Sequence, residues 1–394
     1  MYITPFVYMD KDVNGVINTA LIESLPKSFD PIVIGSNRSI ICNRGTLLKA
    51  RENLLVRAFF KFGPKSLTYT IRDLPDRHYY LWYYNALVKG RNYLKGNKVD
   101  YLHSISIPYS AHWVAMKLKR KYNLPWIAQF YEPWGDNTYR IDKAWVRKKN
   151  VEWERQVAEE ADLIIHNSEE MVASWIQRYG KFVENKILSL PMSFKLDEPK
   201  DEKFESPRSN KLQICHIGNL YRLRRADTFL TALALLIEEY PSYKNLITVS
   251  FIGRVDQDDI NLCKNLHLND MVNFVGVISE SECVDYYKTA DLFLLIESPY
   301  QGKLFFPSKL IRYYYYCRPI LGLTTDNSVL YNQLRKNGHY SCSSNDIDSI
   351  KKIIKKFVDD SSLPDNFNKE AWKEFEANNV ANLYSDIVTN YMLK

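Results

Sequence analysis

The sequence predicts an α/β protein made of two doubly wound, Rossmann-like domains, each built on a parallel sheet. Short apolar runs alternate with helix-like amphipathic stretches twice along the chain, the pattern of parallel strands joined by helices. Between the two series, residues 195–210 are rich in Asp, Glu, Lys and Pro and lose this periodicity, so we interpret them as the interdomain linker. The length of 394 residues fits two domains of roughly 200 residues each.

Strands and helices of the first half follow from this alternation. The expected strands are 2–8, 31–35, 99–103, 126–130 and 161–168. One expected helix begins after Gly15, and three others cover 49–65, 111–121 and 142–160. Glu132 and its aromatic neighbours directly follow the strand at 126–130. They should lie at the carboxyl edge of the sheet, where open α/β sheets bind ligands.

Residues 49–65 form a basic amphipathic segment. Five Lys and Arg residues alternate there with Leu, Val and Phe, a composition suited to the interface of an anionic membrane. The alternative is a helix packed on the sheet with solvated lysines. Residues 51–150 carry 19 Lys and Arg against 7 Asp and Glu, a net charge of +12, whereas residues 201–394 carry −2. This balance suits an anionic membrane or substrate, and no nucleic-acid-binding signature accompanies it.

A second series of elements follows the linker. The expected strands are 212–217, 246–253, 272–274, 292–296 and 320–323, a helix covers 227–240, another opens at Ser308, and two helical segments follow Pro364. The helix at Ser308 carries Lys309 in its first turn. Free N–H groups at a helix start favour an anion, and an ammonium adds a full positive charge. The alternative is a capped surface helix with a solvated lysine.

The segment Pro307-Ser308-Lys309-Leu310, with Pro319-Ile320-Leu321 after it, resembles the donor-site segment of retaining glycosyltransferases of family 4, also called group 1, of the bacterial surface-polysaccharide type. Ile217-Gly218-Asn219-Leu220 with Arg224, and Pro125-Trp126-Ile127 with Glu132-Pro133-Trp134, extend the resemblance along the whole chain. The family has the GT-B fold, in which two Rossmann-like domains face one another across a cleft. The resemblance implies an acceptor-binding domain at 1–200, a donor-binding domain at 211–365 and terminal helices at 366–394 that cross back to the first domain.

Site residues also follow from the resemblance. Arg224 and Lys309 would stabilise the departing diphosphate, and Glu132 and His112 would serve the acceptor, with His103 as an alternative to His112. The residues expected to bind the donor are Gly15, Gly218, Asn219, Arg222, Ser308, Leu310, Arg312 and Glu297. Arg222 and Arg225 flank Arg224, so the residues alone do not decide which guanidinium points inward. The turn at Gly15 can also be a simple strand-to-helix connection.

Arg312 departs from the family pattern, which has Glu at this position to accept hydrogen bonds from the nucleotide ribose. A guanidinium cannot accept a hydrogen bond. Arg312 can instead meet a phosphate or pair with Glu297, and it implies altered donor choice or lost activity. Two rival hypotheses therefore remain: an inactive homologue that binds a sugar nucleotide, and a nucleotide-sugar epimerase on the same fold.

Cysteine and histidine usage argues against a metal site. Six cysteines and seven histidines are scattered without paired spacing, which indicates reduced thiols in the cytoplasm and no metal cofactor. No signal peptide is expected, and no apolar run reaches the ~20 residues that span a bilayer. The resemblance implies a nucleotide-sugar donor and a saccharide or lipid-linked acceptor, as in capsule or lipopolysaccharide synthesis. The expected location is the inner face of the cell membrane, as a peripheral protein.

Overall fold

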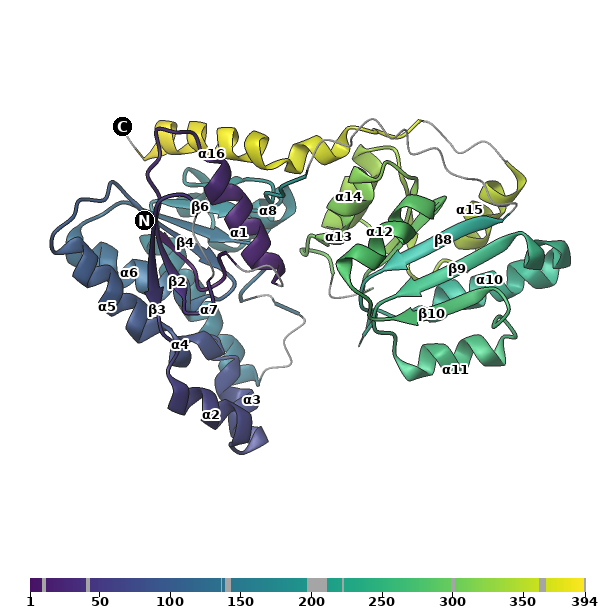
Figure 1. The fold of residues 1–394 in the computed structure, drawn as a ribbon, viewed down its shortest axis with the longest axis horizontal. Helices are drawn as coiled ribbons and strands as arrows, with labels where there is room; N and C mark the ends of the chain where they lie inside the picture. The colour runs from purple at the N-terminus through teal and green to yellow at the C-terminus, as the bar shows by residue number, and fades with distance from the viewer. Residues whose placement is uncertain are drawn as a thin grey trace. The chain divides into compact units, whose positions relative to one another are not determined.

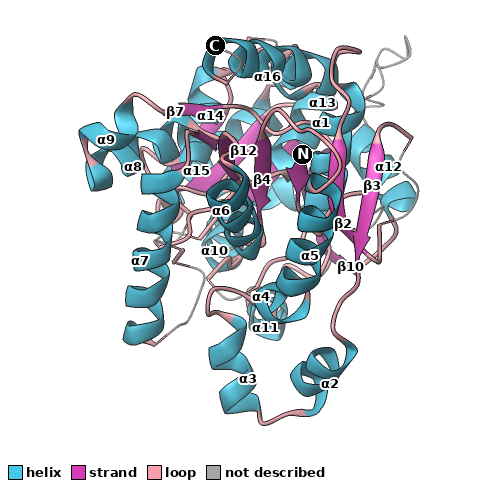
Figure 2. Cartoon of the chain, turned by 90° about the vertical axis from the view of Figure 1, so that its left-hand side faces the viewer, coloured by secondary structure: helices cyan, strands magenta, loops and turns pink. Residues whose placement is uncertain are grey.

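The computed structural model describes the chain except residues 9–11, 40–42, 136, 139–142, 197–210, 222, 299–301, 361–365 and 393–394. The chain divides into two compact units, Met1–Leu196 with Glu374–Lys394, and Asp197–Lys373. In the described residues, each unit contains a parallel sheet flanked by helices (Figures 1 and 2). The predicted α/β fold with two Rossmann-like sheets is therefore confirmed.

The first unit is built on a sheet of seven strands in the order β3-β2-β1-β4-β5-β6-β7, all of them parallel. The strands are β1 (Tyr2–Ile3), β2 (Ile32–Ser36), β3 (Thr46–Ala50), β4 (Leu102–Ser106), β5 (Trp126–Phe130), β6 (Leu163–His166) and β7 (Ile187–Ser189). The helices are α1 (Val13–Ser24), α2 (Leu54–Phe62), α3 (Lys65–Arg72), α4 (Arg77–Leu81), α5 (Tyr83–Leu94), α6 (Ser110–Tyr122), α7 (Ala144–Glu160), α8 (Glu169–Tyr179), α9 (Lys181–Glu184) and α16 (Ala377–Tyr391).

The second unit is built on a sheet of six parallel strands in the order β10-β9-β8-β11-β12-β13. The strands are β8 (Leu212–Ile217), β9 (Ile247–Ile252), β10 (Val272–Gly276), β11 (Leu292–Ile296), β12 (Ile320–Thr324) and β13 (Tyr340–Ser343). The helices are α10 (Asp227–Glu239), α11 (Gln257–Asn265), α12 (Glu280–Thr289), α13 (Lys309–Tyr315), α14 (Val329–Lys336) and α15 (Ile347–Asp359), with a 3₁₀ turn at Pro241–Asn245. A second 3₁₀ turn, Ala371–Phe375, includes the boundary between the two units. Helices α10 and α15 pack together over one face (Figure 1).

Both sheets reverse their strand order at one point. The reversal lies between β1 and β4 in the first unit and between β8 and β11 in the second. Ligands of open α/β sheets bind at the carboxyl ends of the strands at such a point. In the second unit, Gly218 directly follows β8 and Glu297 directly follows β11, so both residues lie where the topology favours a ligand.

The last helix, α16, belongs to the first unit and packs on α1. Its Tyr384 is fully buried, and the Tyr384 hydroxyl lies 2.9 Å from Nδ1 of His103 on β4 and 3.1 Å from the hydroxyl of Tyr101. Nε2 of His103 lies 2.9 Å from Gln129 Oε1 on β5. His103 therefore joins the terminal helix to the centre of the sheet.

Several predicted boundaries are wrong. The strand expected at 2–8 ends at Ile3, and the strand expected at 99–103 is β4, which places His103 inside the strand rather than at its end. The helix expected at 49–65 begins only at Leu54, because residues Thr46–Ala50 pair with β2 as β3. The predicted linker at 195–210 lies almost entirely outside the described residues. In the part of the chain that the structure describes, every helix is too short or too polar to cross a bilayer.

Candidate active site

Lys309 extends over Gly218 at the carboxyl edge of the second sheet. Gly218 has a φ of +139°, and a Cβ atom there would lie 2.6 Å from Lys309 Nζ. A side chain at this position would be strained by the positive φ, and it would displace the end of the flexible Lys309 side chain. The backbone N–H of Ile217 donates to the Tyr313 hydroxyl at 2.9 Å, which ties the end of β8 to the helix that carries Lys309.

Arg224 and Glu297 form an ion pair beside this lysine. Nη2 and Nε of Arg224 donate to Glu297 Oε2 at 3.0 and 3.2 Å. The Glu297 side chain is 1% exposed and that of Arg224 is 17% exposed, so the pair is largely shielded from water. Both residues interact electrostatically with Lys309. The sequence leaves open which arginine points inward, and the structure shows Arg224 in this group.

His216 is the third partner of Lys309, and it was not predicted from the sequence as a site residue. It is fully buried in β8, and its Nε2 lies 3.4 Å from Lys309 Nζ. Its Nδ1 lies 2.9 Å from the carbonyl oxygen of Leu294 on β11. The signal available in the sequence was a histidine inside an otherwise buried strand, two residues before a glycine, because a buried imidazole needs partners.

The electrostatics of this group favour an anion. Burial lowers the pKa of Lys309 from 10.5 to about 8; Glu297 opposes that change and Arg224 adds to it. Among the described residues of this group, the ammonium of Lys309 and the guanidinium of Arg224 lie with the carboxylate of Glu297. A buried ammonium is costly without an anion nearby. A phosphate or diphosphate at this edge would place negative charge close to both cationic side chains.

Three other residues predicted to bind the donor have different surroundings. Ser308 is half-buried at the start of α13, a helix of only seven residues, and its side chain makes no capping bond. Leu310 is fully buried, and its backbone N–H donates to Pro307 at 2.8 Å. In this structure neither the side chain nor the N–H group of Leu310 is presented to a ligand. Asn219 is exposed, and its Oδ1 accepts from the Arg254 backbone at 2.8 Å.

Arg312 does not pair with Glu297. Its Nη2 lies 3.3 Å from Glu280 Oε1 on α12, in a contact that is exposed to solvent. Glu297 is instead the partner of Arg224. Arg225 turns away toward α11, where its Nη2 lies 2.7 Å from the buried carboxylate of Asp259. Arg222 lies outside the described residues.

The first unit contains the predicted acceptor-side residues. Glu132 is half-buried and is the second residue after β5, between the buried residues Tyr131 and Pro133. His112 is fully buried in α6, with Nδ1 2.8 Å from Ser104 Oγ and its ring 4.3 Å from that of Phe130. Burial lowers the pKa of His112 to about 3, so its ring is neutral. A ligand cannot reach this ring without a displacement of the packed helix.

Gly15 belongs to the turn that opens α1. Its backbone N–H donates to Asp12 Oδ1 at 3.1 Å, and its carbonyl accepts from Thr19 Oγ1 at 2.6 Å. This is the geometry of a capped strand-to-helix connection. Because Gly15 is in the first unit, its relation to the group around Lys309 stays a prediction.

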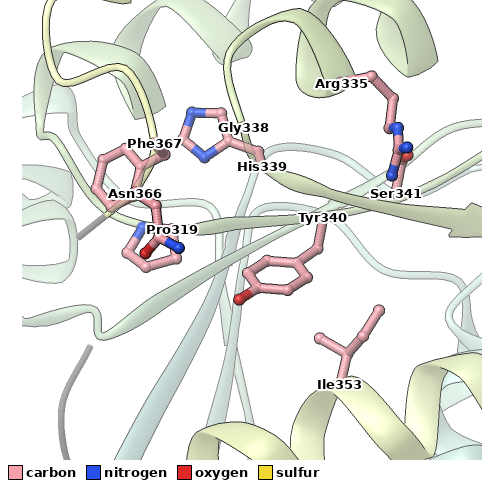
Figure 3. A pocket seen from close by; sticks show the side chains of 9 residues that line it. All are labelled: Pro319, Arg335, Gly338, His339, Tyr340, Ser341, Ile353, Asn366 and Phe367. Atoms are coloured by element: carbon pink, nitrogen blue, oxygen red, sulfur yellow. The ribbon is translucent and has the colours of Figure 1, made fainter. Parts of the chain in front are cut away.

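A cavity of about 470 Å³ lies at the opposite edge of the second sheet (Figure 3). Pro319 precedes β12 and Tyr340 begins β13, so this cavity is at the amino-terminal end of those strands. The lining residues are Pro319, Arg335, Gly338, His339, Tyr340, Ser341, Ile353, Asn366 and Phe367. The group around Lys309 is at the carboxyl end, so the two sites are distinct.

The sequences of both units match known families. Residues 197–374 match the model of glycosyl transferases group 1, and residues 39–191 match that of glycosyltransferase family 4. Together the two matches cover most of the chain, which is therefore a family 4-like, group 1 glycosyltransferase. The recognition made from the sequence is confirmed at this level, together with the GT-B fold.

Individual relatives are distant. The chain is 24% identical over 225 residues to the alpha-monoglucosyldiacylglycerol synthase of Streptococcus pneumoniae, a match that covers 54% of this chain and about half, 49%, of that relative. Among solved structures, Anabaena HepE in complex with UDP has a TM-score of 0.66 at 11% identity, covering 97% of this chain and 98% of HepE. The apo lipopolysaccharide outer core galactosyltransferase WaaB has a TM-score of 0.64 at 12% identity, covering 99% and 98%. At these identities the structural likeness shows the fold.

Proposed function

We propose that the protein transfers a sugar from a nucleotide-diphosphate sugar to a saccharide or lipid-linked acceptor, with retention of the anomeric configuration and without a metal. The reaction would belong to the synthesis of a bacterial surface polysaccharide at the inner face of the cell membrane. The observation that carries the proposal is the group Lys309, Arg224 and Glu297 at the switch point of the unit that matches group 1. Because Gly218 has no side chain, the end of Lys309 can lie against its backbone in this group.

The chemistry of this group suits the departing diphosphate. As the bond between the anomeric carbon and the diphosphate oxygen breaks, negative charge grows on that oxygen, and the acceptor oxygen bonds to the anomeric carbon. Positive charge fixed beforehand at this place lowers the barrier. Lys309 and Arg224 supply it, and the acceptor proton passes to the leaving oxygen on the same face. A dedicated metal is then not required for charge stabilisation.

The relatives support a particular first choice of substrates. Anabaena HepE has been solved with UDP and with UDP-glucose. The pneumococcal relative is named for a glucosyl group on diacylglycerol, which is a lipid acceptor. We therefore expect UDP-glucose, with a lipid-linked acceptor, to be the first combination worth measuring.

Incubation with labelled UDP-glucose and a panel of lipid and saccharide acceptors tests this function. The expected result is a glycoside whose anomeric configuration matches that of the donor, with release of UDP in equal amount and no change when a chelator is added. An isomerised nucleotide sugar would indicate the epimerase instead. Saturable donor binding without any product across the nucleotide sugars would indicate the inactive homologue, and loss of rate with chelator would contradict metal independence.

The helices α2 and α3 form the proposed membrane contact. They project beyond the sheet of the first unit (Figure 2), and α2 has no buried residue. Their exposed apolar side chains and the basic residues among them, which we call the basic apolar surface, are Leu54, Leu55, Phe59, Phe62, Leu67 and Tyr69 with Arg51, Arg57, Lys61 and Lys65. Leu55 is 83% exposed and Phe62 is 77% exposed, which is unfavourable in water and suits the interface of an anionic bilayer.

Binding to anionic vesicles should depend on both the apolar and the basic side chains of the basic apolar surface. Leu55→Ser with Phe62→Ser should weaken partitioning at least about tenfold, because each large apolar side chain contributes about 1.5–3 kcal/mol when buried. Cosedimentation with phosphatidylglycerol vesicles measures it, and rising salt should weaken the wild type because exposed charges are screened. Leu383→Ser on α16, where Leu383 is 49% exposed, is the matched control. Equal binding of the double variant and wild type, or equal binding to neutral vesicles, would refute the contact.

A further inference from the structure

His216 is a buried side chain that the mechanism above does not use. It lies in β8, two residues before Gly218, with no exposed surface and with its Nε2 3.4 Å from the ammonium of Lys309. A buried imidazole at a charged site has either a structural or a positioning role. The contacts of its two nitrogens distinguish these roles.

The first contact fixes the tautomer. Nδ1 of His216 lies 2.9 Å from the carbonyl oxygen of Leu294, which can only accept, so Nδ1 carries the proton. Burial, and next the charge of Lys309, lower the pKa of His216 well below its ordinary value, so the ring is neutral. Nε2 therefore presents a lone pair to Lys309 Nζ, 3.4 Å away.

We propose that His216 is a positioning residue that fixes the Lys309 ammonium at the diphosphate site, an inference that rests on the proposed function. A lysine side chain has a flexible four-carbon stem, and the end of Lys309 lies where a side chain of residue 218 would be. A neutral acceptor can hold the ammonium in this space without cancelling its charge. A carboxylate at the same place would neutralise the charge that the leaving group needs. Among the described residues, the other charged groups near Lys309 are Glu297, which attracts it, and Arg224, which repels it.

The first experiment needs no substrate. The ¹³Cε shift of Lys309, assigned by Lys309→Arg in lysine-labelled protein, should titrate near pH 8 in the wild type. In His216→Phe the ammonium loses an acceptor, so its pKa should fall to about 7 or lower, since a hydrogen bond to a charged group is worth about one pKa unit or more. His339→Phe, a buried histidine of the same unit at the other edge of the sheet (Figure 3), is the matched control and should leave the titration unchanged.

The second experiment measures turnover with the donor that the transfer assay identifies. His216→Phe should lower kcat by about 10–100-fold with little change in the acceptor KM, because a displaced catalytic group costs about this much. His216→Gln, whose amide oxygen can accept, should recover part of the loss. In the Lys309→Ala background, His216→Phe should cost less than about threefold, since the two residues act as a unit.

The outcomes separate the two proposals. An unchanged Lys309 titration in His216→Phe would overturn the positioning role whatever the turnover, and so would additive losses in the double variant. A shifted titration in a protein that transfers no sugar would overturn the proposed function and leave the contact standing. If His216→Phe melts far below the wild type, His216→Asn, with a shorter side chain that cannot reach Nζ, replaces it and His216→Gln stays the conservative partner.

Discussion

Lys309→Ala should reduce sugar transfer by about 10²–10³-fold while the protein stays folded. Removal of one preorganised group that stabilises developing negative charge costs about 2.7–4 kcal/mol in the barrier. The ammonium is largely enclosed by Gly218, His216 and Arg224, and its burial disfavours the charged form, as the lowered pKa of about 8 indicates. Loss of this side chain therefore leaves the unfolding free energy unchanged or slightly higher at neutral pH.

Steady-state rates and a melting curve on the same preparations test this expectation. Lys309→Arg should recover only part of the rate, because a planar guanidinium has a different shape from an ammonium. Lys303→Ala is the matched control, since Lys303 is an exposed lysine of the same loop. Turnover of Lys309→Ala within about threefold of the wild type would place Lys309 outside the groups that contact the leaving diphosphate.

The central strands of both sheets were predictable because they are buried on both faces. Trp126–Phe130, Leu212–Ile217 and Leu292–Ile296 were predicted with their observed bounds, and each reads as an almost continuous apolar run. A run of this kind between turn residues has few alternatives to a parallel strand. Two series of such strands, each alternating with helices, are then enough to predict two doubly wound sheets.

Three of the four edge strands were missed for the opposite reason, and the fourth, β10, was predicted as 272–274. Strands β3, β7 and β13 are at the ends of the two sheets, and most of their side chains are half-buried or exposed. Polar residues such as Lys49 and Ser341 interrupt their apolar pattern. The apolar periodicity of such an edge strand is weak in the sequence. These three strands are therefore identified only by their pairing: β3 with β2, β7 with β6, and β13 with β12.

The candidate site was predictable as a set of residues but not as a geometry. Lys309, Arg224 and Glu297 each follow a buried strand of the second unit, and the carboxyl edge of a parallel sheet brings such positions together. The partner of each charge was not predictable, because Arg224 and Arg225 are adjacent in sequence yet face different carboxylates. His216 is 93 residues from Lys309, and only the folded sheet brings them into contact.

Arg224→Ala should lose both turnover and stability, and the two losses should be separable. Its guanidinium supplies charge for the leaving diphosphate, so the rate should fall about 10²–10³-fold. Its removal also leaves the carboxylate of Glu297, 1% exposed, without that guanidinium. Glu297 keeps Lys309 nearby but loses both hydrogen bonds from Arg224. Removing a hydrogen-bond partner of a buried charged group costs about 1.5–3 kcal/mol, which lowers the melting temperature by about 3–12 °C for a unit of this size.

Adding Glu297→Gln to Arg224→Ala should restore most of the melting temperature, because the amide is neutral, and none of the rate. Arg225→Ala is the matched control: it strips the equally buried Asp259 of its guanidinium and should lower the melting temperature while turnover stays within about threefold. Rates are compared well below the lowest melting temperature, so that loss of fold does not enter them. A double variant that regains the rate along with stability would mean that Arg224 acts only by neutralising Glu297. Rate loss in Arg225→Ala equal to that in Arg224→Ala would mean that instability, not lost charge at the diphosphate, explains both.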